Sequence, residues 1–276
     1  MAREEPVALL CALALAAAAH AQDQRPLPKG SPGALVAGAL KVHLYAGEGL
    51  PADSLRALAR PQVTLWLDTR SNTLKESTVE RVARFDEAWV RLRAPLSKTD
   101  ALVLARIPKA GVWATPKDLE GLSGRVPGVR RIAVEVDGPL DAATAERLAK
   151  ARPSVVRWRP SGPVDLLGWG LFLALPGQKV LVPAPEELLA TRCPGRSRAL
   201  PALEVHVATL LAMSADVFPC GSGTRVIVPG EVEPWLLQSL VVRDPSVELV
   251  VEVSESPEAA TRARILMERL GLGPGR

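Results

Sequence analysis

Short apolar stretches with strand character recur along the chain about every 23 residues. Most of them are followed by a proline or an acidic residue of the kind found in the first turn of a helix. This regular spacing indicates that one strand-and-helix unit is used repeatedly. The expected strands are centred on Leu44, Leu65, Leu92, Val112, Val134, Val156, Val180, Val205, Ile227 and Val250.

The segment around residue 134 shows the unit in detail. Between residues 131 and 137 apolar residues alternate with more polar ones, which is the period of a strand. One face of this strand is therefore apolar, and the other carries Glu135 and Asp137. Gly138 and Pro139 break the strand, and residues with helical spacing follow. The apolar stripe of the expected helix consists of Leu140, Ala145, Leu148 and Ala149.

Strands that alternate with helices favour parallel pairing, because a parallel crossover needs a helix-sized connection. Repeated crossovers of one hand curl the sheet, so we expect an α/β fold built as a TIM-type (βα)8 barrel. An open α/β solenoid is the alternative. The barrel is favoured because the chain only approximates the Leu-x-x-Leu-x-Leu-x-x-Asn frame of a leucine-rich solenoid.

The number of candidate strands is larger than the eight that such a barrel needs. We therefore expect the first of them, residues 41–46, to form a lid and the weak one at residues 111–114 to be a loop. Residues 171–175 and 179–183 are an alternative candidate for a hairpin, which would interrupt the parallel order of the strands.

The face of the strands that points away from the helices is polar. A doubly wound sheet is buried on both sides, so this face argues for a barrel interior or a solvated concave surface. It carries Arg91, Arg93, Glu135, Arg157, Arg159, Glu204, His206 and Glu252.

Composition predicts one domain preceded by a tether. Hydrophobic residues make up 47% of the 276 positions, which is enough for one sizeable core or at most two small domains, and we expect a single barrel-like domain over residues 39–276. Residues 22–38 are rich in proline and glycine and are typical of a flexible linker.

The amino-terminal segment predicts export. An apolar run at residues 7–19 is too short to span a bilayer, and Ala19-His20-Ala21 has the small residues that a signal peptidase requires. We expect residues 1–21 to be removed by cleavage between Ala21 and Gln22. The mature protein would then be periplasmic or secreted, with no stable membrane anchor. Two acidic residues beside Arg3 depart from the usual positive leader, and a mis-assigned start codon is one explanation.

The predicted export also determines which cysteines remain in the mature protein and in which compartment. Cleavage would remove Cys11 and leave Cys193 and Cys220 in an oxidising compartment, where a disulfide is the economical interpretation. It would close a loop of about 28 residues and be worth roughly 3 to 4 kcal/mol. Two separate buried thiols are the competing interpretation. A zinc site is not expected, because two cysteines without a nearby histidine pair do not fill four positions.

Charge and motifs argue against several functions. The net charge is +4 and the basic residues form no continuous stripe, so nucleic acid is not an expected partner. The chain contains neither a phosphate-binding glycine loop after a strand nor a Gly-x-Ser-x-Gly elbow. His43 and His206 are far apart and lack a carboxylate pattern specific to a metal, so no metal and no cofactor is expected.

Candidate chemistry lies at the carboxyl ends of the strands, where barrel enzymes place their sites. Paired carboxylates across that mouth, with a tryptophan as a sugar platform, would suit glycoside hydrolysis. The competing interpretation is structural, with interior Arg and Glu on neighbouring strands neutralising one another. The candidate catalytic residues are Glu135, Asp137, Glu204 and His206, and the candidate substrate-binding residues are Trp66, Asp68, Arg157, Trp158 and Glu252.

These observations favour an exported, non-catalytic binding or interaction protein on a (βα) barrel, with a glycan or another extracytoplasmic ligand as its partner. A carbohydrate-active hydrolase is the enzymatic alternative. The hydrolase requires two carboxyl groups roughly 5 to 10 Å apart in an accessible mouth. The binding protein predicts a broad groove with exposed aromatic side chains.

Overall fold

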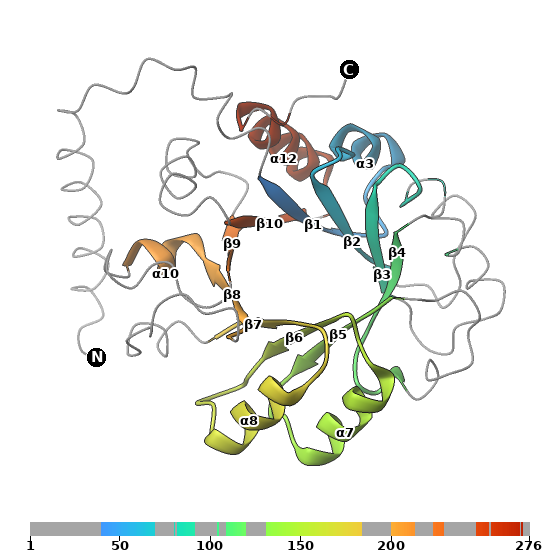
Figure 1. The fold of residues 1–276 in the computed structure, drawn as a ribbon. Coiled ribbons are helices and arrows are strands. Elements are labelled where there is room, and N and C mark those ends of the chain that lie inside the picture. Colours follow the sequence, from blue (N-terminus) through green and yellow to red (C-terminus); the bar gives the residue numbers. More distant parts are fainter. Residues whose placement is uncertain are drawn as a thin grey trace, which may run out of the picture.

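Ten parallel strands close into a barrel with helices on its outside (Figure 1). Each strand pairs with its neighbours in the sequence, and β1 pairs with β10 to complete the ring. The computed structural model describes residues 40–69, 80, 82–91, 104, 109–119, 131–183, 200–212, 223–228, 247–253, 255–270 and 272. The strands are β1 (Lys41–Gly47), β2 (Val63–Asp68), β3 (Glu87–Arg91), β4 (Ala110–Ala114), β5 (Ile132–Asp137), β6 (Val155–Arg159), β7 (Gln178–Leu181), β8 (Ala202–His206), β9 (Thr224–Val228) and β10 (Glu248–Val253).

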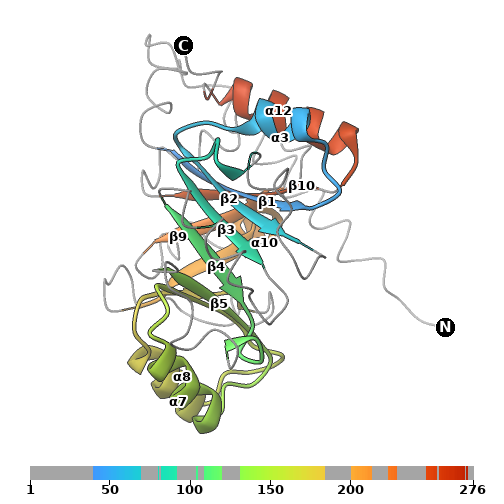
Figure 2. The ribbon, with the colours of Figure 1, turned by 90° about the vertical axis from the view of Figure 1, so that its right-hand side faces the viewer.

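Helices cover the outer face of this wall. In Figures 1 and 2, α3 and α12 lie together on one side of the barrel, and α7 and α8 lie together on the opposite side. None of the described helices is long and apolar enough to cross a membrane. The described helices are α3 (Ala52–Leu58), α7 (Ala142–Ala151), α8 (Leu166–Ala174), α10 (Val207–Ala212) and α12 (Pro257–Arg269).

The unit formed by β5 and α7 follows the predicted pattern. After the strand, Gly138 adopts a φ of 91°, a conformation that suits glycine, and turns the chain toward the helix. Asp141 caps α7 by accepting the backbone N–H of Thr144 at 2.7 Å. Leu148 of the predicted stripe is buried against the wall, whereas Ala149 is exposed.

The mixed α/β class and the barrel are confirmed, but the count of eight strands is wrong. Residues 41–46 are not a lid, because β1 pairs with both β2 and β10. Residues 111–114 are not a loop, because β4 pairs with both β3 and β5. The apolar side chains of both strands belong to one large apolar cluster of the described residues, and an unpaired strand edge would leave backbone groups without partners.

The open solenoid and the hairpin are both excluded. The solenoid is wrong because β1 and β10 close the ring. The hairpin is wrong because residues 171–174 belong to helix α8, and β7 pairs in parallel with β6. Gly177 makes the turn between α8 and β7 with a φ of 82°. Among the described residues, the same strand–helix–strand order occurs at β1–α3–β2 and β5–α7–β6.

The described residues form two separate apolar clusters. The larger one lies between the wall and the helices and contains the outward side chains of every strand, such as Val42, Leu65 and Val134. The smaller one lies inside the barrel. A ring of eight strands is just wide enough for side chains to fill, and the diameter grows with the number of strands. Ten strands therefore enclose more space than one layer of side chains can fill.

Candidate functional site

The inner cluster is uneven around the ring. Strands β1 to β4 contribute large aromatic side chains, whereas β5 to β8 contribute alanine and valine at the corresponding inward positions. Large residues on one side and small ones on the other leave space beside the aromatic side chains. The aromatic members are Tyr45, Trp66, Trp89 and Trp113, and the small members are Ala133, Val155, Val180 and Ala202.

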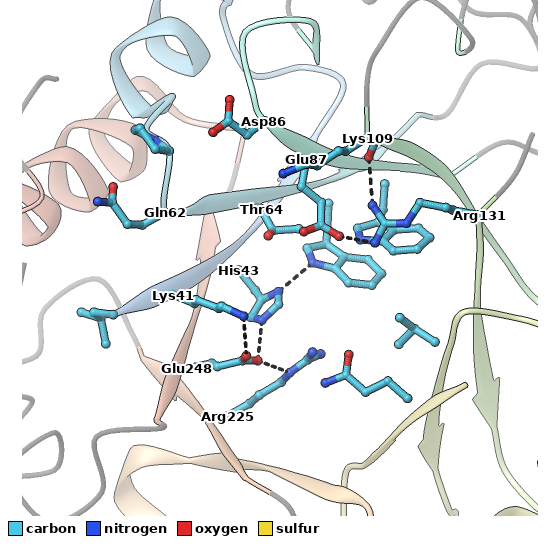
Figure 3. Close-up of a pocket in the computed structure, with 16 residues that line it drawn as sticks. Lys41, His43, Gln62, Thr64, Asp86, Glu87, Lys109, Arg131, Arg225 and Glu248 are labelled. Carbon is cyan, nitrogen blue, oxygen red and sulfur yellow. Dashed lines mark hydrogen bonds and ion pairs between the residues drawn. The ribbon is translucent and has the colours of Figure 1, made fainter. Parts of the chain in front are cut away.

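A cavity of about 430 Å³ occupies this space at the amino-terminal mouth of the barrel (Figure 3). Its lining comes from the first residues of the strands and from the residues just before them, including Lys41, Glu87, Gln178 and Glu248. We refer to it as the mouth cavity. It opens at the end opposite to the one where the sequence placed the candidate chemistry.

Three strands supply a hydrogen-bonded group on one wall of the mouth cavity. Nε2 of His43 on β1 donates to Oε2 of Glu248 on β10 at 2.8 Å. Nε of Arg225 on β9 donates to the same oxygen at 2.9 Å. Nζ of Lys41 lies 4.0 Å from the other carboxylate oxygen, and Figure 3 shows the carboxylate between these three side chains. The strand register places Lys41 and Arg225 on either side of Glu248, and His43 lies two residues further along β1.

The second ring nitrogen of His43 is also engaged. Nε1 of Trp66 donates to Nδ1 of His43 at 3.1 Å, so Nδ1 carries no proton and Nε2 does. Burial lowers the pKa of His43, and the charge of Arg225 lowers it further, against the hydrogen bond to Glu248. His43 is therefore a neutral imidazole without a free lone pair. It can hold its neighbours in place, but it has no acceptor to offer as a general base.

Glu248 is the anionic centre of this group. Burial alone would raise the pKa of Glu248, but the hydrogen bond from His43 and the charge of Arg225 outweigh it and lower the pKa to about 2. The carboxylate is therefore ionised at neutral pH and fixes the guanidinium of Arg225.

Only some of the hydrogen-bond donors of Arg225 have partners among the described residues. Its side chain is 3% exposed and lines the mouth cavity, into which its guanidinium points in Figure 3. Nη1 is buried and has no hydrogen-bond partner among the described residues. An unpaired buried donor costs free energy, about 1 to 3 kcal/mol. The mouth cavity is thus bordered by a fixed guanidinium that has one unpaired N–H donor group.

Stacked aromatic rings form the adjoining wall. Trp66 stacks on Tyr45 and on Trp89, with 5.3 Å between ring centroids in each pair. The guanidinium of Arg131 lies 4.6 Å from the ring centre of Trp89 and donates to Glu87 at 2.5 Å. Because both faces of each tryptophan are in use, the rings present mainly their edges to the mouth cavity.

A second charged group lies one layer further along the barrel. Arg157 on β6 donates through Nη1 to Glu135 on β5 and through Nη2 to Glu204 on β8, the latter at 2.5 Å. All three side chains are buried. Arg91 adds a further cation, with its Nη1 3.8 Å from Oε2 of Glu135. We call Glu135, Arg157 and Glu204 the central ion cluster.

The remaining sequence-predicted residues lie apart from the mouth cavity, except for Trp66, which lines it. Asp68 and Asp137 are at the carboxyl-terminal mouth, 3.6 Å from Arg91 and 3.8 Å from Arg159 respectively. His206 and Glu252 are exposed at the ends of β8 and β10.

Trp158 lies on the other side of the wall from the interior. It packs on Phe172 of α8 and donates its indole N–H to the carbonyl of Gly138 at 2.8 Å. It therefore belongs to the outer apolar cluster, and the structure does not bring it near Trp66. The strand parity already separates the two, because Trp158 alternates with the inward-pointing Arg157.

Several predictions concern positions outside the described residues. These are the signal peptide with its Ala21 and Gln22 cleavage site, the linker at 22–38, Arg93, and the pair Cys193 and Cys220. Among the residues that the structure does describe, no group of three or more His, Cys, Asp or Glu side chains could hold a metal ion.

Sequence reasoning missed Arg225, Glu248, Trp89 and Arg131 as members of a site. The signal that could have found them is parity: each is a polar or aromatic residue at the beginning of a strand, at a position that alternates with the helix-facing apolar residues. Among the described residues, Trp66 and Trp89 are buried and line a cavity that opens at the amino-terminal mouth, instead of lying exposed in a broad groove.

Comparison with protein-family models and with curated proteins finds no match for this sequence.

Proposed function

We propose that this chain is a non-catalytic binding protein and that its ligand is a small molecule held in the mouth cavity. The observation that carries the proposal is a preformed cavity lined by fixed polar groups. Its volume of about 430 Å³ lies within the range of small-molecule sites, roughly 300 to 1,000 Å³. Most of its lining residues are polar or charged, and oriented polar groups are what small-molecule sites use for specificity.

The state of the acidic residues favours binding over hydrolysis. A glycosidase needs one carboxylic acid that donates a proton and a second carboxylate that attacks or activates water. Glu135 and Glu204 both accept hydrogen bonds from Arg157, and their side chains are 6% and 0% exposed. Glu248 is held ionised by His43 and Arg225. These acids are occupied in holding the barrel interior together.

We further propose that the protein works outside the cytoplasm, as the apolar run at residues 7–19 and the small residues before Gln22 indicate. In that setting the ligand would be an extracytoplasmic small molecule. Mass spectrometry of the protein secreted from an expressing bacterial cell tests this, and an amino terminus at Gln22 is the expected result. Full-length protein retained in the cytoplasm would contradict export.

A ligand screen with a blocked variant tests the binding function. Gln178 lines the mouth cavity and is exposed, so Gln178→Trp should close the entrance without disturbing a packed core. Small molecules that raise the melting temperature of the unchanged protein should lose that effect in Gln178→Trp. The matched control is Glu252→Trp, an equally bulky change at the opposite mouth, which should keep the effect.

Two outcomes would contradict the proposal. Ligands that stabilise Gln178→Trp as well as the unchanged protein bind somewhere else. Glycan hydrolysis that disappears in Glu135→Gln or Glu204→Gln would replace binding by catalysis.

A further inference from the structure

We propose that the mouth cavity takes a small organic monocarboxylate, whose carboxylate binds the guanidinium of Arg225. This inference rests on the proposed binding function and specifies the ligand class. It is carried by four features of the mouth cavity: the unpaired donor of Arg225, the way in which Arg225 is held, the charge balance of the lining, and the apolar side chains within that lining.

The unpaired donor calls for an acceptor. Nη1 of Arg225 is buried without a hydrogen-bond partner among the described residues, and the same guanidinium borders the mouth cavity. A carboxylate oxygen is the strongest common acceptor for a guanidinium N–H. A ligand that supplies one removes the free-energy cost of leaving the donor unpaired.

Glu248 prepares Arg225 for this role. It binds Nε at 2.9 Å and is itself held by His43 at 2.8 Å, so the guanidinium is fixed before any ligand arrives. Fixing a side chain in its binding conformation lowers the entropic cost of association. The arrangement leaves the outer end of the guanidinium directed into the mouth cavity (Figure 3).

The charge balance of the cavity lining favours a ligand with a single negative charge. Four basic side chains and three carboxylates line the mouth cavity, and His43 is neutral, so the lining carries one net positive charge. Two of the basic side chains, Lys41 and Lys109, are exposed at the rim, where they attract anions. The electropositive edges of Trp66 and Trp89 add to the preference for an anion.

The walls favour an organic body behind the carboxylate. Leu40, Pro61 and Val155 line the mouth cavity together with the two tryptophans. Its volume of about 430 Å³ corresponds to roughly a dozen water-sized groups, far more than a bare inorganic anion occupies. These apolar side chains lie in a mostly polar lining beside the fixed guanidinium of Arg225, which matches a small molecule with a carboxylate at one end and a compact apolar body at the other.

Calorimetric titration of the full-length chain with matched probes tests the ligand class. Benzoate, benzamide and benzylamine share one ring and differ in charge, and inorganic phosphate is an anion without the ring. We expect benzoate to bind at least tenfold more tightly than benzamide and benzylamine, and phosphate not to bind. Equal affinity for benzoate and benzamide, or binding of phosphate without benzoate, would overturn the inference.

Substitution of Arg225 tests whether its guanidinium binds the ligand's carboxylate. Arg225→Lys keeps a cation beside Glu248 but removes the guanidinium fork, and the affinity for benzoate should fall about ten- to a hundredfold. The matched control is Arg159→Lys at the opposite mouth, outside the cavity lining, which should leave the affinity unchanged. An unchanged affinity in Arg225→Lys would overturn the assignment.

Lys41→Gln provides a second variant that does not depend on a buried residue. The side chain of Lys41 is 70% exposed, so the change should not disturb folding. Removing this charge should lower the affinity for benzoate about two- to fivefold and leave the affinity for benzamide unchanged. Equal effects on both probes would contradict the role of charge.

The results also separate this inference from the proposed function. If benzamide or benzylamine binds as tightly as benzoate and the Gln178→Trp variant abolishes it, the binding function stands and the ligand class is wrong. If no probe and no library compound binds in the mouth cavity, both are wrong.

Discussion

At the scale of single residues, His43 shows how a histidine can be structural in a site that resembles a catalytic one. A histidine bonded to a glutamate is the geometry of many acid–base pairs. Here Nδ1 accepts from Trp66 and Nε2 donates to Glu248, so neither nitrogen is free. The ring connects the aromatic wall to the carboxylate that holds Arg225. Its chemical neutrality is what makes that connection possible, because a protonated ring could not accept from an indole.

The unfolding free energy should fall as the pH decreases below about 6.5. The pKa of His43 is lowered from 6.5 in the folded protein, so the unfolded chain takes up a proton there that the folded chain does not. Urea denaturation followed by circular dichroism from pH 8 to 5 measures this. His43→Gln should flatten the curve in that range, and a pH dependence as steep as that of the unchanged protein would contradict the assignment to His43.

A second loss of stability is expected at lower pH. The pKa of Glu248 is lowered from 4.5 to about 2, so its stabilising effect is present above pH 4.5 and is lost as the pH falls toward 2. The loss amounts to at most about 3 kcal/mol. Glu248→Gln should show a smaller decrease across this interval in the same denaturation experiment. A decrease as large as that of the unchanged protein would contradict the assignment.

Gly111 is required by the close approach of a tryptophan. A Cβ at this position would collide with the six-membered ring of Trp89, which is stacked on Trp66 and has no room to move away. Gly111→Ala should therefore destabilise the protein by about 1 to 3 kcal/mol, measured by urea denaturation.

Gly170→Ala is the control for this prediction. Gly170 lies in α8 with open space around its Cα, and alanine should stabilise this helix by up to about 1 kcal/mol. A similar loss of stability in both variants would mean that the tryptophan stack does not restrict position 111.

At the scale of secondary-structure elements, the central ion cluster joins strands that are not all neighbours. Arg157 connects β6 to β5 beside it and to β8, which lies beyond β7. Burial disfavours the charged guanidinium, but the charge of Glu204 outweighs this effect and raises the pKa of Arg157. The cluster fills the middle of a ring that is too wide for apolar side chains alone.

Removal of Arg157 should be strongly destabilising. Arg157→Met leaves Glu135 and Glu204 buried without their main partner, which should cost about 3 to 5 kcal/mol of unfolding free energy. Arg159→Met removes a half-exposed arginine from the same strand and should cost at most about 1 kcal/mol. Replacing both glutamates by glutamine in the Arg157→Met background should recover part of the loss. Equal effects of the two single changes would contradict the central role of Arg157.

At the scale of the whole molecule, closure depends on β1. This strand is the first in the barrel, yet it bonds to β2 on one side and to β10 on the other. Closure leaves the barrel without an exposed edge. It also brings His43 next to Glu248, 205 positions away in the chain.

Hydrogen exchange tests this closure. Backbone amides of β1 should exchange as slowly as those of β2 and β10, because all three strands are paired on both sides. A lid would exchange much faster than the strands below it. Fast exchange of β1 together with slow exchange of β2 and β10 would mean that the ring is open at this point.

Local patterns in the amino-acid sequence were sufficient to locate most of the strands and to distinguish their two faces, although β3 ends at Arg91, before the expected centre at Leu92. The alternation around Val134 and the helix start after Gly138 each involve only a few neighbouring residues, and such a pattern defines a strand, a turn and the helix that follows. The polar inner face excluded a sheet that is covered on both sides and left a barrel or an open solenoid. The poor match to a leucine-rich repeat frame then favoured the barrel.

Long-range pairing and packing set how many strands close the ring and which mouth holds a cavity. Whether β1 and β4 join the wall depends on backbone pairing with strands elsewhere in the chain. The cavity exists because aromatic side chains of β1 to β4 face small ones of β5 to β8, and no local pattern records which inward positions meet. The same reason explains why Arg225 and Glu248 were missed. Nothing in their local sequence distinguishes them from other charged residues, and only barrel closure brings Glu248 into contact with both His43 and Arg225.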